Sequence, residues 1–178
     1  MTTASASRVL PFGFDGETFG RNLRAHLGHW GVAYLVVVLA AILFKTHFAF
    51  GLNSSESLPC RVFLIHKGEL PLRGQYVAFR WSGGGPYAAG FTFVKILAGV
   101  PGDTVTRVKR DFFVNGDFVG TAKSHSRSGV PLALGATGAL PPGRYYVRAP
   151  HPDSLDSRYQ LTGWVAENQI LGRAYALF

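Results

Sequence analysis

Ser57 and Lys95 are the two residues whose types could together do covalent chemistry. A serine hydroxyl is a weak nucleophile until a neighbouring base takes its proton. Lys95 stands in an apolar run, residues 93–97, and burial of such a lysine disfavours the ammonium form and brings its pKa towards neutrality. A neutral amine of this kind could activate Ser57 for attack on a carbonyl carbon. The pair therefore predicts acyl transfer by a serine and a lysine, without a histidine.

Each of these residues also has a plainer interpretation. Ser55 and Ser57 precede Pro59 and could be ordinary loop serines. Lys95 could be a charged residue that protects the edge of a sheet. Cys60, the only cysteine, could offer a thiol nucleophile, but a small half-buried side chain is the interpretation that we favour. The six histidines share no metal-ligand spacing, so we expect neither a metal nor an organic cofactor.

An apolar stretch precedes the segment that carries Ser57. Residues 30–44 carry no charge, and the apolar region extends from residue 27 to about residue 50. A membrane-spanning helix needs about 20 such residues. A cleaved signal peptide would have a shorter apolar region and a small-residue cleavage site, whereas Lys45, Thr46 and His47 follow here. We therefore expect an uncleaved membrane anchor at residues 27–50.

Basic residues on the N-terminal side of this anchor predict its direction. Arg8, Arg21 and Arg24 precede it, and the flank richer in arginine and lysine normally stays in the cytoplasm. We therefore expect a cytoplasmic segment at residues 1–26 and, across the membrane, a catalytic domain at residues 51–178. In a bacterium with two membranes, this describes a single-pass protein of the inner membrane with a periplasmic domain.

The chain has a net charge of +8, from 18 lysines and arginines against 10 acidic residues. Nucleic-acid binding is one interpretation of such a charge. The basic residues are scattered rather than clustered, and an excess of charge alone is weak support for a partner. Attraction to anionic lipid headgroups fits a domain tethered at a membrane better. We therefore expect the lipid bilayer as a partner and no nucleic acid.

Beyond the anchor, short alternating or apolar runs bounded by turn residues predict strands, and no long run has a helical period. Asn115 and Gly116 are the pair that a two-residue hairpin turn prefers. Residues 123–142 are irregular and could form a surface loop or a flap over substrate. We predict a mostly β domain of antiparallel sheets or a partly closed barrel. The clearest runs are residues 61–66, 75–80, 91–97, 104–108, 111–119 and 144–148.

Four short motifs follow one another behind the anchor, and their order is more specific than any one of them. They are Asn53-x-Ser55-x-Ser57-Leu58-Pro59, residues 74–79, residues 94–103, and Pro152-Asp153-Ser154-Leu155-Asp156-Ser157-Arg158-Tyr159 with residues 163–174 behind it. Together they closely resemble the type I signal peptidase family, the membrane peptidases that use a serine and a lysine. The resemblance covers about two-thirds of the chain, from residue 53 to residue 174.

This resemblance implies a role for each residue that matches a family motif. Ser57 would be the nucleophile and Lys95 the general base. The backbone N–H of Ser57 and the hydroxyl of Ser55 would form the oxyanion hole, where losing one donor costs about 3–4 kcal/mol of transition-state stabilisation. Ser154 would hydrogen-bond the lysine amine. Supporting roles would fall to Asp156 and Arg158, as a structural ion pair behind the site, and to Asp153, whose role the resemblance defines less closely.

Within the family, the motifs around Ser57 and Ser154 look most like the TraF-type branch, the conjugative-transfer peptidases. That branch processes the pilin precursor of a type IV secretion system, and some members join the pilin ends into a ring. The resemblance therefore implies a pilin precursor, or another exported polypeptide, as substrate and contact with a secretion apparatus. Two alternatives stay open: a general leader peptidase for exported proteins, and a membrane-anchored scaffold of the secretion complex without catalysis.

Overall fold

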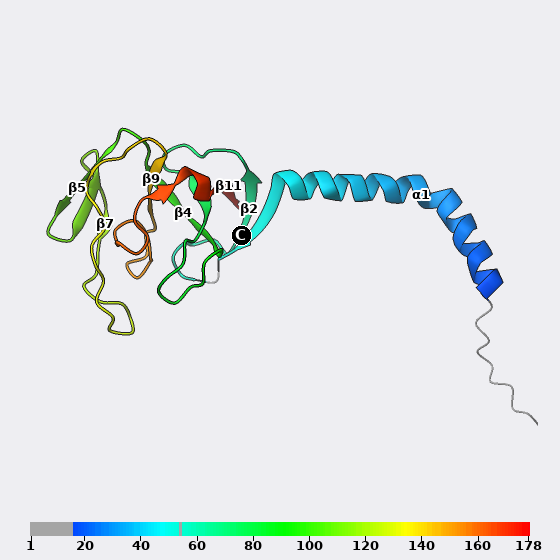
Figure 1. Ribbon diagram of the computed structural model, residues 1–178, viewed down its shortest axis with the longest axis horizontal. Coiled ribbons are helices and arrows are strands. Elements are labelled where there is room, and N and C mark those ends of the chain that lie inside the picture. The colour runs from blue at the N-terminus through cyan, green and yellow to red at the C-terminus, as the bar shows by residue number, and fades with distance from the viewer. Residues whose placement is uncertain (1–15, 54) are drawn as a thin grey trace, which may run out of the picture. The chain divides into compact units, whose positions relative to one another are not determined.

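The computed structural model describes residues 16–53 and 55–178 (Figure 1). The first part of the predicted cytoplasmic segment, with Arg8, lies outside these residues. The chain divides into two compact units, Met1–Leu43 and Phe44–Phe178. The second unit holds every strand that the structure describes and every residue predicted to do chemistry.

The first element is helix α1, Gly16–His47, which is apolar over most of its length. Within its segment Phe19–His47, an 18-residue window has a mean hydropathy of 2.1, and the apolar side chains of the segment are exposed in the protein. At about 1.5 Å per residue the segment is longer than the roughly 30 Å of a bilayer core. By length and composition it could cross a membrane. The helix ends at His47, and residues 48–50 of the predicted anchor begin the first strand.

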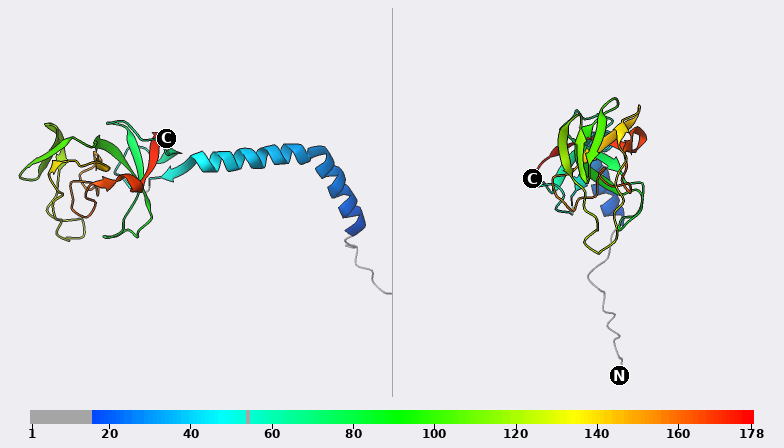
Figure 2. Two further views of the ribbon diagram at one scale, coloured as in Figure 1. Left: turned by 45° about the horizontal axis from the view of Figure 1, so that its top comes forward. Right: turned by 90° about the vertical axis from the view of Figure 1, so that its left-hand side faces the viewer.

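Two antiparallel sheets make up the second unit, which confirms the mostly β prediction (Figures 1 and 2). The larger has the order β1-β2-β11-β3-β4-β9-β10, and the smaller has the order β7-β6-β5-β8. The larger sheet is built from β1 Phe48–Leu52, β2 Val62–Lys67, β3 Tyr76–Arg80, β4 Thr92–Gly99, β9 Arg144–Arg148, β10 Val165–Ala166 and β11 Ile170–Ala176, with the short 3-10 helix η1 Glu167–Gln169 before β11. The smaller is built from β5 Thr104–Val108, β6 Asp111–Val114, β7 Asp117–Thr121 and β8 Gly138–Ala139.

The hairpin predicted from Asn115 and Gly116 is present between β6 and β7. Both residues have positive φ angles, 52° and 88°, as the favoured two-residue hairpin turn requires. The strands β5 and β9 begin and end where the sequence runs predicted, at residues 104–108 and 144–148.

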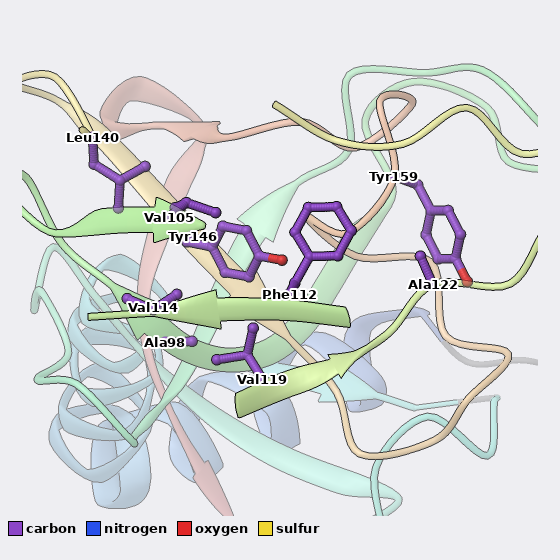
Figure 3. Close-up of a cluster of buried hydrophobic side chains, with 9 residues drawn as sticks. All are labelled: Ala98, Val105, Phe112, Val114, Val119, Ala122, Leu140, Tyr146 and Tyr159. Carbon is purple, nitrogen blue, oxygen red and sulfur yellow. The ribbon is translucent and has the colours of Figure 1, made fainter. Parts of the chain in front are cut away.

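A buried hydrophobic cluster joins the two sheets (Figure 3). Phe112 on β6 and Tyr146 on β9 are fully buried, and their ring centroids are 6.5 Å apart. Ala98 on β4 and Val114 on β6 belong to the same cluster. Burying these side chains removes apolar surface from water and holds the small sheet against β4 and β9. The cluster thus immobilises β4, the strand that carries Lys95.

Candidate active site

Lys95 lies in the interior of the larger sheet, on β4 and opposite Val77 of β3. Its side chain is only 5% exposed, which is rare for a lysine. The amine donates a hydrogen bond to the Ser154 hydroxyl, with 2.8 Å between the atoms. Desolvation by burial, assisted by the positive charge of Arg158, lowers the pKa of Lys95 to about 8 although Asp156 opposes the shift. A substantial fraction of the amine can therefore be neutral near physiological pH.

Ser57 lies in the connection between β1 and β2 and is itself only 6% exposed. Its hydroxyl oxygen lies 2.9 Å from that of Ser55. The next residue, Leu58, belongs to the buried cluster against which Val94 and Ile96 pack. These two residues flank Lys95 along β4. Packing therefore anchors the serine loop to the strand that carries the lysine.

In the described part of the chain, no hydrogen bond joins the Ser57 hydroxyl to the Lys95 amine. Each group instead bonds a second serine, Ser55 in one case and Ser154 in the other. Catalytic hydrogen bonds are often absent or long without substrate and form in the Michaelis complex. The structure thus brings together Lys95 with Ser154 and Ser57 with Ser55, as two pairs.

Behind Lys95, Asp156 and Arg158 form a fully buried ion pair. Two guanidinium nitrogens each lie 2.8 Å from a different carboxylate oxygen, which is the bidentate geometry. Asp156 also accepts from the backbone N–H of Ala149, and Arg158 donates to the carbonyl of Thr121. These bonds connect the segment that carries Ser154 to both sheets. The two charges act on the pKa of Lys95 in opposite directions, since Asp156 raises it and Arg158 lowers it.

Asp153 lies apart from these groups and has no hydrogen bond or ion pair with the predicted dyad in the described residues. It pairs instead with Lys123 and Arg127, which lower its pKa to about 2. Arg127 also reaches the exposed carboxylate of Glu56, with 3.4 Å between the atoms. These bonds tie the irregular segment after residue 122 to the loop around Ser57. Lys123 and Arg127 are 26 to 30 residues from Asp153 in sequence, so no local pattern indicated them.

A pocket of about 480 Å³ lies beside the nucleophile loop and offers room for a bound side chain. It is lined by Asn53, Ser55, Glu56, Leu58, Pro59 and Arg61. Among the described residues, no group of three or more histidine, cysteine, aspartate or glutamate side chains could hold a metal ion.

The model of one protein family, described as signal peptidase, peptidase S26, matches residues 24–178. The chain belongs to this family. Two of its relatives are signal peptidase I of Bacillus amyloliquefaciens and signal peptidase I T of Bacillus subtilis strain 168. Each is 28% identical to this chain over 169 residues, which covers 84% of this chain and 83% of the relative. A solved signal peptidase I from Enterococcus faecalis V583 is 24% identical, with a TM-score of 0.39, and the match covers 62% of this chain and 98% of that one.

Signal peptidase I relatives imply a serine peptidase, and the apolar helix α1 agrees with a membrane-anchored member of the S26 family. The broad prediction of a type I signal peptidase is thereby confirmed. The TraF-type branch, the individual catalytic roles and the direction of the anchor stay predictions.

The pKa of Lys95 predicts how the activity of this family member depends on pH. If the neutral amine is the general base, kcat/KM should rise about tenfold for each pH unit below 8 and level off above it. Initial rates on one peptide substrate between about pH 6 and pH 9.5 would measure this profile, with the fold checked by circular dichroism at each pH. A profile that is level from pH 6 to pH 8 would contradict the assignment of the base.

Proposed function

We propose that this chain is a membrane-anchored peptidase in which Ser57 is the nucleophile and Lys95 the general base. The observation that carries the proposal is the buried amine of Lys95, whose pKa is lowered to about 8 within an S26 family member. A lysine on the surface would stay charged at neutral pH and could not accept a proton. The Ser154 hydroxyl supports the proposal because it orients the amine.

In the proposed reaction, the Lys95 amine takes the Ser57 proton as the serine oxygen attacks a peptide carbonyl carbon. The backbone N–H of Ser57 and the hydroxyl of Ser55 stabilise the oxyanion that forms. The Lys95 ammonium then gives its proton to the departing amine, and the acyl chain stays on Ser57. Water, deprotonated by the same amine, attacks the ester and releases the shortened polypeptide.

For the substrate, we propose the leader region of exported proteins. Support comes from the relatives named signal peptidase I, because the match covers 83% of their length. The N-terminal segment would be cytoplasmic and the β domain periplasmic, with α1 in the inner membrane. Because Ser57 follows the end of α1 by ten residues, this anchor would keep the nucleophile near the membrane surface where leader regions emerge.

A second candidate is the pilin precursor of a conjugative type IV secretion system. It is favoured by the resemblance of the Asn53–Pro59 and Pro152–Tyr159 motifs to the TraF-type branch. In this case the amine of the pilin's own N-terminus would attack the acyl-enzyme in place of water. The product would be a ring that weighs one water less than the linear cleaved chain. Contact with the secretion apparatus belongs to this candidate alone.

One experiment separates these functions. The purified full-length chain in detergent would be incubated with a leader-containing precursor and, separately, with a pilin precursor, and the products would be weighed by mass spectrometry. We expect Ser57→Ala to lower turnover by at least about 10³-fold, because the acyl-enzyme can no longer form. Ser82→Ala, a change at an exposed serine, should leave turnover unchanged.

The outcome also tests the third possibility, a scaffold without catalysis. Full turnover by Ser57→Ala would contradict the proposed nucleophile. If neither precursor is cut, and Ser57 does not react with a serine-directed acylating probe such as a penem, the scaffold would be the better account.

A further inference from the structure

The Asn53 side chain closes the loop that carries the nucleophile. Its amide nitrogen donates to the backbone carbonyls of Leu58 and Cys60, at 3.3 Å and 3.1 Å. Its amide oxygen accepts from both the backbone N–H and the hydroxyl of Ser55, at 3.2 Å and 2.9 Å. One half-buried side chain thus makes four hydrogen bonds across a loop of eight residues. Within the residues that the structure describes, the Ser55 hydroxyl bonds two side chains, those of Asn53 and Ser57.

The partners of Asn53 determine which way its amide points. The carbonyls of Leu58 and Cys60 can only accept, so they require the amide nitrogen on their side. The backbone N–H of Ser55 can only donate, so it requires the amide oxygen on the opposite side. A flipped amide would place its nitrogen against the Ser55 N–H, a donor facing a donor, and its oxygen against the two carbonyls, an acceptor facing acceptors. The amide oxygen of Asn53 therefore faces Ser55.

This orientation of the amide determines which group donates in the two hydrogen bonds that link Ser57 to Ser55 and Ser55 to Asn53. Because an amide oxygen has no proton, the Ser55 hydroxyl must be the donor in its bond to Asn53. The Ser55 oxygen is then left to accept, and the Ser57 hydroxyl is the donor in the 2.9 Å contact between the two serines. In the substrate-free protein, the Ser57 proton points towards Ser55 and the Ser55 proton points towards Asn53.

We propose that Asn53 is a positioning residue that holds the Ser55 hydroxyl ready for the oxyanion. The inference rests on the proposed function, in which Ser55 donates to that oxyanion. When substrate binds, the Ser57 proton passes to Lys95, and the Ser55 hydroxyl turns its proton from the Asn53 oxygen to the developing negative charge. The Ser55 oxygen stays in place throughout, because its backbone N–H remains bonded to Asn53. Preorganised donors of this kind act in the transition state and not in substrate binding.

Steady-state kinetics on wild type, Asn53→Ala, Ser55→Ala and the double variant test this coupling. We expect Asn53→Ala to lower kcat about tenfold with KM changed by less than about twofold, since the interaction belongs to the transition state. Ser55→Ala should lower kcat by about 10²-fold. In the Ser55→Ala background, the Asn53 change should cost less than about twofold, because the group that it positions is gone.

A second asparagine supplies the matched control. Asn115 also holds a turn through its side chain, with bonds to the backbone N–H of Thr104 and to Asp103. Asn115→Ala removes two side-chain bonds of the same kind from the smaller sheet, so it should lower stability and leave kcat unchanged. Equal kcat losses for the two asparagine variants, or losses for Asn53 and Ser55 that multiply in the double variant, would overturn the positioning role.

Hydrogen exchange of the loop peptide gives a reading that does not depend on activity. Because the Ser55 amide proton is bonded to Asn53, Asn53→Ala should speed its exchange by at least about tenfold under native conditions. Unchanged exchange would overturn the inference whether or not a substrate is found. If wild type and Ser57→Ala are equally inactive on every precursor while exchange still responds, the proposed function fails and the loop geometry stands.

Discussion

Replacement of Lys95 by methionine is expected to abolish peptidase activity and, at neutral pH, to stabilise the fold. Methionine has nearly the same length and fills the same space, but it has no amine to desolvate. Activity should fall by at least about 10³-fold because Ser57 loses its base. A residue that is kept for its function is expected to destabilise the fold in this way.

The sign and size of the stability change follow from the pKa. Burial lowers the pKa of Lys95 from 10.5 in the unfolded chain to about 8 in the folded protein. Between these values the unfolded chain binds more protons, so wild-type stability should rise with pH from about 8 to about 10.5. At pH 7 the amine is mostly charged in both states, and the folded state bears most of the desolvation penalty of about 3 kcal/mol. The advantage of Lys95→Met should therefore be largest at pH 7 and shrink above pH 8.

Urea unfolding of both proteins at pH 7 and at about pH 10 would measure this difference. An exposed lysine supplies the control: Lys109→Met should change the free energy of unfolding by less than about 0.5 kcal/mol at either pH. If Lys95→Met were less stable than wild type at pH 7, the amine would be held by favourable interactions that outweigh its burial. A loss of stability that persists at high pH would indicate a packing defect instead.

Replacement of Asp156 by alanine is expected to cause the largest loss of stability among the predicted site residues. The change leaves the Arg158 guanidinium buried, at 2% exposure, without its counter-charge. Breaking a buried ion pair from one side typically costs about 3–5 kcal/mol. The backbone N–H of Ala149 also loses its acceptor. The free energy of unfolding should therefore fall by about 3–5 kcal/mol, as urea unfolding at pH 7 would measure.

Asp153 is the matched control for this prediction, because it also pairs with basic side chains. Its partners Lys123 and Arg127 are 45% and 66% exposed, so they can be solvated when the carboxylate is lost. Asp153→Ala should therefore cost about 1 kcal/mol or less. Similar losses in the free energy of unfolding for the two aspartate variants would show that burial does not determine how much each ion pair stabilises the fold. A double change of Asp156 and Arg158 to apolar residues should recover much of the loss from Asp156→Ala.

Local signals in the sequence predicted much of the secondary structure. The Asn115-Gly116 pair is sufficient to specify its hairpin, because those two residues tolerate the positive φ angles of the turn. The apolar stretch before Ser57 likewise predicts a long helix from composition alone, although it did not predict that the helix ends at His47. The apolar neighbours of Lys95 also indicated a buried amine, because a strand that is covered on both faces buries its polar side chains along with its apolar ones.

Contacts between distant segments were decided only by the tertiary structure. β11, near the C-terminus, lies between β2 and β3, and no local pattern states which strands become neighbours. The partners of Asp153 are a comparable case, since ion pairs across 26 to 30 residues depend on how loops return to the sheets. The four bonds of Asn53 likewise depend on where the backbone of its own loop turns.

Residue types and their order along the chain were thus enough to identify the family and to predict which serine and which lysine would react. The directions of their hydrogen bonds were not, because a hydroxyl donates to whichever acceptor the fold brings within about 3 Å. Sequence therefore determined which groups could react. Tertiary structure decided that, before substrate binds, Ser57 bonds Ser55 and Lys95 bonds Ser154.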